Sequence, residues 1–162
     1  MLLPAVAFYQ VVLAVHIMAV VVTFGVIFAY PLIQLVGDRL DPRAMPWYHR
    51  VQRVIGQRLI SPGLLVVLLA GIYLSSKLHQ WSHFYVQWGL AVAVVIGGLG
   101  GLFFSPNERR LAELAERDLE AAGGGEVAWS QEYLALRRRN ALVGMGAAVL
   151  VLVTIYVMTV QT

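Results

Sequence analysis

AVAFYQVVLAVHIMAVVVTFGVIFAYPLIQLV, residues 5–36, contains no Asp, Glu, Lys or Arg. About 20 consecutive apolar residues are enough for an α-helix to cross the roughly 30 Å hydrocarbon core of a bilayer. A membrane β-strand would instead alternate apolar and polar residues over about ten positions, and this run does not alternate. The stretch therefore predicts a membrane-spanning helix, long enough to be tilted.

Three further apolar runs follow, at residues 51–76, 85–104 and 140–160, and the connections between them carry nearly all the charge. Hydrophobic residues make up 59% of the chain. Charged residues make up only 13%, whereas about a quarter of the residues in soluble domains are charged. We therefore predict an all-α fold: a polytopic membrane protein with a four-transmembrane-helix bundle, forming one membrane domain over residues 1–162.

Composition also excludes several classes of function. The chain contains no cysteine, so disulfides, thiolate metal sites and thiol catalysis are excluded. Its formal charge is +3, but the basic residues lie beside apolar spans, where they indicate topology and not nucleic-acid binding. The spans contain no Asp or Glu that could form a carboxylate proton relay.

The distribution of basic residues predicts the orientation. The first connection and the start of the second span hold Arg39, Arg43, Arg50, Arg53 and Arg58, and the third connection holds Arg109, Arg110, Arg117, Arg137, Arg138 and Arg139. The second connection holds only Lys77. Because connections rich in Lys and Arg stay in the cytoplasm, we expect loops 37–50 and 105–139 to be cytoplasmic, and both termini to lie outside the plasma membrane.

The third connection contains the only stretch with a soluble character, residues 105–126. Ser105-Pro106-Asn107-Glu108 matches a capping box with proline at the first helical position, and Gly123-Gly124-Gly125 is a helix stop. This predicts a short amphipathic cytoplasmic helix, lying on the bilayer or against the bundle. Ser130 can cap a last helix that starts early and runs from Gln131 to Val160.

Polar side chains in the first span form the main candidate site. Tyr9, His16, Thr23 and Tyr30 are spaced by seven and should share one inward-facing side of the helix. His16 could ligate a haem iron, carry protons or contact a substrate. The structural alternative is a neutral imidazole bonded to a backbone carbonyl, to Thr154 or to a buried water. His49, His79 and His83 lie at the interfaces, which disfavours bis-histidine haem.

The second span contributes one more candidate, Arg58, near its cytoplasmic end. Its guanidinium can reach the headgroups without further function. Alternatively, Arg58 with Gln57 and Ser61 forms a docking point for an anionic group, beside a kink expected at Pro62.

Small residues in the third and fourth spans predict close helix packing. Gly89, Ala93, Gly97 and Gly101 recur every four residues, and Gly144 and Ala148 repeat the pattern more weakly. These ridges could meet within one subunit or between subunits. The Arg137-Arg138-Arg139 triplet is typical of a topology anchor and alternatively binds anionic lipid.

Three short stretches carry a resemblance to known families: residues 15–21 (VHIMAVV), 58–62 (RLISP) and 71–74 (GIYL). They resemble small bacterial four-helix integral membrane proteins of uncharacterised function and, more weakly, the copper-resistance D type and the four-helix membrane protoporphyrinogen oxidase. The oxidase resemblance implies a haem at His16. Where that family has a lysine after the third-helix tryptophan, this chain reads Trp88-Gly89-Leu90-Ala91-Val92.

The leading hypothesis from the sequence is a membrane bundle without enzymatic chemistry that binds a small apolar or amphipathic ligand, or self-associates into a homo-oligomer. One alternative is a haem-linked redox protein with haem b held by His16 as axial ligand. Another is a subunit of an oligomeric transporter or channel. Besides the haem iron of that alternative, no metal is expected, and the lipid bilayer is the expected partner.

Overall fold

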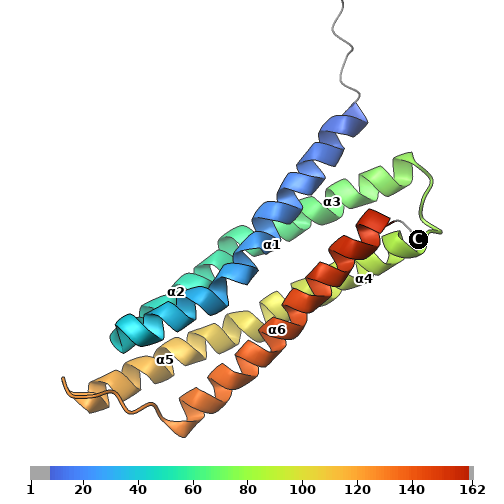
Figure 1. The fold of residues 1–162 in the computed structure, drawn as a ribbon. Helices are drawn as coiled ribbons and strands as arrows, with labels where there is room; N and C mark the ends of the chain where they lie inside the picture. Colours follow the sequence, from blue (N-terminus) through green and yellow to red (C-terminus); the bar gives the residue numbers. More distant parts are fainter. Residues whose placement is uncertain (1–7, 161–162) are drawn as a thin grey trace, which may run out of the picture.

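Over residues 8–160, the part of the chain that the computed structural model describes, every regular element is a helix, and the helices join into four long rods (Figure 1). The first rod is α1 (Phe8–Leu40), and the last is α6 (Gln131–Val160). The second comprises α2 (Met45–Ile55), η2 (Gly56–Ile60) and α3 (Ser61–Lys77), preceded by the short turn η1 (Pro42–Ala44). The third comprises α4 (Phe84–Gly98), η3 (Leu99–Phe104) and α5 (Ser105–Ala122).

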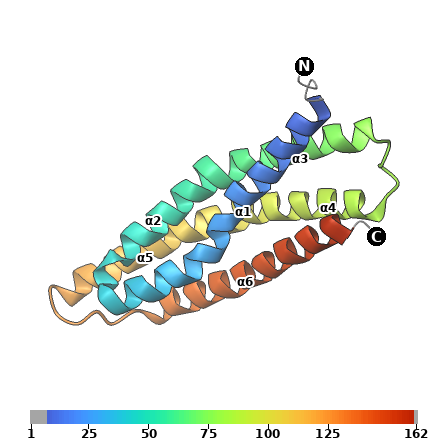
Figure 2. The ribbon, with the colours of Figure 1, turned by 45° about the horizontal axis from the view of Figure 1, so that its top comes forward.

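The rods alternate in direction and close into a bundle (Figure 2). α1 packs on α3, α3 on α4, α4 on α6, and α6 returns to α1. Both ends of the described chain therefore lie at the end of the bundle that holds the α3–α4 turn. This agrees with the expected placement of the termini beside the second connection.

All four rods are long and apolar enough to cross a membrane. The third has 39 residues, which corresponds to about 58 Å at 1.5 Å per residue, roughly twice the hydrocarbon thickness. The rods therefore continue well past their apolar parts at the end opposite the termini. We call this part the helical extension. It comprises residues 37–40 at the end of α1, the whole of α2, the whole of α5, and residues 131–139 of α6. Much of the expected loops 37–50 and 105–139 is thus helical.

The third rod differs from the expected break at Ser105. Ser105 has helical angles, with φ of −59° and ψ of −46°, and its N–H bonds to the carbonyl of Gly100, so no capping box forms. The segment expected as a separate amphipathic helix, 105–126, is instead helical to Ala122 and continuous with the third span. Gly123 ends it in the left-handed conformation at φ 59°, as the sequence indicated.

A wide π-helical turn precedes the proline in each of the second and third rods. η2 ends immediately before Ser61-Pro62, and η3 ends immediately before Ser105-Pro106. In each, the serine N–H bonds to the carbonyl five residues earlier, Gly56 or Gly100. Because proline has no N–H and its ring clashes with the carbonyl four residues back, an extra residue in the preceding turn lets the helix continue. The side chain of Gln57 donates to Ser105 Oγ at 3.0 Å and links the two turns.

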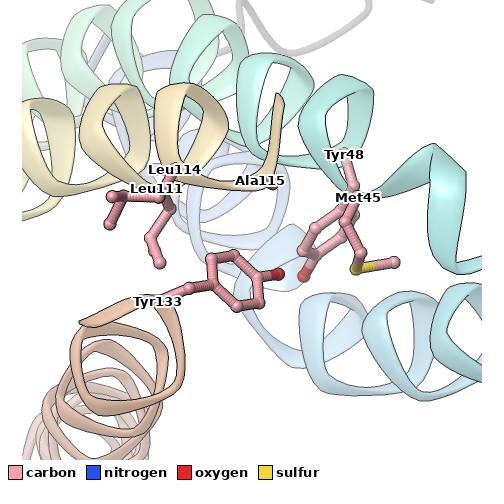
Figure 3. Packing of buried hydrophobic residues seen from close by; sticks show 6 residues of the cluster. All are labelled: Met45, Tyr48, Leu111, Leu114, Ala115 and Tyr133. Atoms are coloured by element: carbon pink, nitrogen blue, oxygen red, sulfur yellow. The ribbon is translucent and has the colours of Figure 1, made fainter. Parts of the chain in front are cut away.

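Two hydrophobic clusters hold the rods together. One joins α4 and α6 in the apolar part of the bundle, through Val92, Ile96, Ala147 and Val151. The other lies inside the extension and consists of Met45, Tyr48, Leu111, Leu114, Ala115 and Tyr133. Figure 3 shows Tyr133 reaching from α6 into the space beside α2 and α5. The extension therefore has a core of its own.

Candidate functional site

His16 lies against α3, partly buried. Its Nδ1 is 3.0 Å from the carbonyl oxygen of Val67. A carbonyl only accepts hydrogen bonds, so Nδ1 carries the proton, and in the neutral imidazole Nε2 then carries the lone pair. The structural alternative raised for this histidine, a bond to a backbone carbonyl, is therefore present. The same bond also fixes the tautomer that a metal-ligating histidine uses.

α1 and α3 approach very closely at Thr23. Thr23 is buried, and a Cβ placed on Gly63 would lie 2.1 Å from its Oγ1. About two turns farther along α3, a Cβ on Gly71 would lie 3.4 Å from Cε1 of His16. Glycine in α3 is therefore what allows the polar face of α1 to pack inward, as the heptad spacing predicted.

The other residues predicted for this site lie elsewhere. Tyr9 is half-buried near the start of α1, and Tyr30 lies near the extension, where its carbonyl accepts a 3.0 Å bond from the Tyr48 hydroxyl. Arg58 is exposed on η2. Its expected companions have other partners, since Ser61 Oγ donates to the Gly56 carbonyl and Gln57 to Ser105. The five candidates do not converge on one pocket.

The glycine ridge of the third rod is used mainly within the subunit. A Cβ on Gly89 would lie 1.9 Å from Cε of Met158, and one on Gly97 would lie 3.1 Å from Leu64. Ala93 is buried. On α6, Gly144 faces Phe104 and Ala148 is half-buried. A Cβ on Gly101 would meet nothing within 4 Å, so only this end of the predicted ridge is open.

A buried chain of polar side chains crosses the extension, and the sequence did not predict it. Glu108 on α5 accepts from His49 Nδ1 at 2.7 Å and from Asn140 Nδ2 at 2.6 Å. His49 Nε2 lies 3.1 Å from the Tyr133 hydroxyl, and Asn107 donates to Asn140 at 3.0 Å. His49 is 1% exposed and Glu108 7% exposed. These hydrogen-bonded side chains thus join α2, α5 and α6 through polar groups that are costly to leave unpaired.

The buried polar side chains of the extension hydrogen-bond mainly to one another. Tyr133 is 0% exposed and stacks on Trp129 at 4.6 Å, and burial raises the pKa of its hydroxyl to about 12. The Tyr133 hydroxyl therefore stays protonated near neutral pH. Both ring nitrogens of His49 already have partners. A carboxylate beside an imidazole can serve as a base, yet packing separates this pair from solvent.

Salt bridges cover the outside of the extension. Arg110 donates to Glu132 at 2.7 Å, Arg117 bridges Asp118 and Glu132, and Arg137 pairs with Asp38 of α1. The hydrogen bond from Arg110 holds the pKa of the Glu132 carboxyl below its usual value. A hollow of about 210 Å³ between α2 and α5 is lined by both signs of charge, including Arg50 and Glu116, which pair with each other.

Comparison with protein-family models found no match to this sequence, and comparisons with curated proteins and with solved structures found none either. The resemblance to small four-helix membrane proteins stays a hypothesis that rests on its three short stretches.

Proposed function

We propose that the protein is a four-span integral membrane protein of the plasma membrane that acts by binding, without enzymatic chemistry. The observation that carries the first half is the distribution of apolar side chains. Large hydrophobic residues such as Val21, Leu69, Val94 and Leu152 are more than half exposed around the four rods. A soluble monomer rarely exposes contiguous apolar surface of this extent, whereas lipid tails favour it.

Binding is favoured over catalysis because the groups with catalytic potential are engaged in packing. His49, Glu108 and Tyr133 bond to one another inside the extension core, and His16 bonds to the backbone of α3. The surfaces that remain are apolar rods and a charged extension, which suit an amphipathic ligand or a second copy of the chain.

The orientation we propose places the extension in the cytoplasm. Eleven of the 12 Lys and Arg residues lie in or next to the extension, and only Lys77 lies at the other end. Because basic segments resist translocation, the termini and the α3–α4 turn would be outside.

Single-cysteine labelling tests both statements, since the natural chain has no cysteine. Ser82→Cys lies in the α3–α4 turn and Glu126→Cys between α5 and α6, both at exposed positions. In intact cells a membrane-impermeant maleimide should label only Ser82→Cys, and in permeabilised cells both. Alkaline carbonate should leave the protein in the membrane pellet. Equal labelling of both positions in intact cells would contradict the orientation, and release into the supernatant would contradict membrane insertion.

A second candidate function is haem-linked redox chemistry at His16, and the Nδ1 bond to Val67 favours it. A histidine that ligates iron through Nε2 usually donates its other N–H to a carbonyl, which orients the ring and raises its basicity. His49 has both nitrogens bonded, and His79 and His83 are exposed beside the α3–α4 turn, so His16 would be the one histidine to hold the iron. A bound haem b would supply one-electron chemistry, and His16 would hold it from the α1–α3 face.

An absorption spectrum of the detergent-purified protein tests this candidate. The haem candidate predicts a Soret band that His16→Gln abolishes and that His83→Gln, an exposed histidine at the outer end of the bundle, leaves unchanged. A colourless, folded protein from haem-supplemented cells would exclude it and leave the non-enzymatic proposal standing.

A further inference from the structure

α6 carries a surface hollow of about 550 Å³ that no residue of the His16 face lines. Its lining lies at helical spacing from Gln131 to Val143, about 18 Å along one side of the helix. Gln131 and Leu134 form one end, Arg138 and Arg139 lie in the middle, and Leu142 and Val143 form the other end. Small Ala135 contributes to the depression among larger neighbours. The hollow is therefore amphipathic along its length.

The two arginines of the hollow differ from their neighbours in charge pairing. Arg110, Arg117 and Arg137 each have a carboxylate partner. Arg139 lies over the ring of Phe103 at 5.2 Å, a contact that holds the guanidinium without neutralising it. Arg138 is exposed, and among residues 8–160 no partner occupies its guanidinium. The hollow thus presents two positive charges that the protein leaves uncompensated.

The position of the hollow matches the boundary of the bilayer. After Arg139, α6 has no charged residue up to its end at Val160. Arg138 and Arg139 would therefore stand at headgroup depth, with Leu142 and Val143 one turn deeper among acyl chains. The lining of the 210 Å³ hollow between α2 and α5 does not change from charged to apolar along its length, and it contains its own carboxylates.

We propose that this hollow is a binding site for one anionic phospholipid, with the headgroup phosphate on Arg138 and Arg139 and an acyl chain along Leu142 and Val143. Guanidinium groups suit phosphate because they donate several N–H bonds in a fixed plane. A second copy of the chain is a poorer occupant: two copies inserted in the same orientation would bring both pairs of arginines together at one depth. This inference rests on the proposed membrane insertion and names the amphipathic ligand.

Native mass spectrometry of the full-length protein, with titrated phosphatidylglycerol or phosphatidylcholine, tests the proposal. We expect one phosphatidylglycerol to bind in preference to phosphatidylcholine, about fivefold more weakly for each arginine changed in Arg138→Gln and Arg139→Gln. Ala135→Phe fills the hollow at unchanged charge and should also weaken binding. Arg39→Gln, which removes an exposed arginine of α1 in the extension but outside the hollow, should not.

Three results would overturn the site. These are equal retention of the two lipids, an equal loss in Arg39→Gln, or full binding by Ala135→Phe. Displacement of the lipid by millimolar inorganic phosphate would show a free-anion site and overturn the lipid assignment. Because carbonate extraction reports insertion separately, a protein that stays in the pellet without lipid preference contradicts this inference alone.

Discussion

At the scale of single residues, the buried polar chain of the extension is the most demanding feature of the structure. Each member depends on its neighbour: Glu108 accepts from His49 and Asn140, and Asn140 accepts from Asn107. A buried donor that loses its acceptor cannot bond to water instead, so the free energy of its desolvation is no longer offset. The chain therefore makes the relative positions of α2, α5 and α6 specific, where apolar contacts alone would tolerate sliding.

Glu108→Leu should lower the free energy of unfolding by about 3 kcal/mol, because it leaves two buried donors without an acceptor. Denaturation in mixed micelles, followed by circular dichroism, measures the change. Glu113→Leu is the matched control on the exposed side of α5, where Glu113 pairs with Arg109, and should cost less than about 1 kcal/mol. Adding His49→Phe to Glu108→Leu should cost less than the two single changes summed. Similar stability of Glu108→Leu and the control would contradict this account.

The sequence predicted this part of the site poorly, for a physical reason. Glu108 stands three residues after Ser105, which is the spacing of a capping carboxylate. Its actual partners are far away in the chain, at His49 and Asn140. The partner of His16 is a backbone carbonyl, which has no side-chain signature at all. The inward direction of His16 and Thr23 was predictable because lipid offers polar groups no partners.

At the scale of elements, the π turn η3 explains how one rod serves two cores. Each residue turns an α-helix by about 100°, so Glu108 would lie about 120° around from Ile96 in a regular helix. If the wide turn takes up one residue, that difference falls to about 20°. Ile96 and Glu108 then face the same side, and both are buried. From the sequence, the same change of phase looked like the end of one helix and the start of another.

Inserting one alanine after Leu102, which is 86% exposed, should destabilise the extension, although it removes no buried contact. The added residue would rotate α5 by about 100° and carry Glu108 away from His49. Leu102→Ala is the control, because it places an alanine in the same turn and keeps the residue count. Unfolding in mixed micelles separates the two. An insertion variant as stable as Leu102→Ala would show that the residue count of this turn does not set the phase.

The glycines of the third rod should respond differently to enlargement. Gly89→Leu should destabilise the fold modestly, because the flexible end of Met158, which packs against Gly89, must move away. Gly101→Leu should leave unfolding unchanged, since the space around Gly101 is open. Native mass in mild detergent then tests the transporter or channel hypothesis. An oligomer lost in Gly101→Leu would support assembly through this end of the ridge, and a monomer in both the natural chain and this variant would count against it.

At the scale of the whole molecule, composition determines more than motif. The four long apolar helices were predictable because a chain that crosses hydrocarbon must form them, and the structure places helices over all four predicted runs within its described residues. The extension was not predictable as a folded part. Its core is small, and its helices combine buried polar residues with salt-bridged surfaces, so they resemble charged loops in a hydropathy pattern.

Cleavage of the loop between α5 and α6 should leave the molecule assembled. Glu126 is exposed and non-helical there, so a glutamate-specific protease should cut after it first. Contacts of α6 with α4, α5 and α1 should hold the two fragments together in mild detergent, as one peak in size-exclusion chromatography. Glu126→Gln should resist this cut. Fragments that elute separately would show that the connecting loop is needed to hold α6 in the bundle.

The two wide turns also have a mechanical consequence. η2 and η3 contact each other, and the hydrogen bond from Gln57 to Ser105 links them. The π turns of the second and third rods therefore lie side by side at the same height in the bundle. Helices bend most easily where their regular ladder is broken. The two turns can therefore act as a hinge, and α5 extends about 27 Å beyond them. A tilt of about 5° there swings the tip at Gly123 by about 2 Å, while the apolar ends of the rods keep their places.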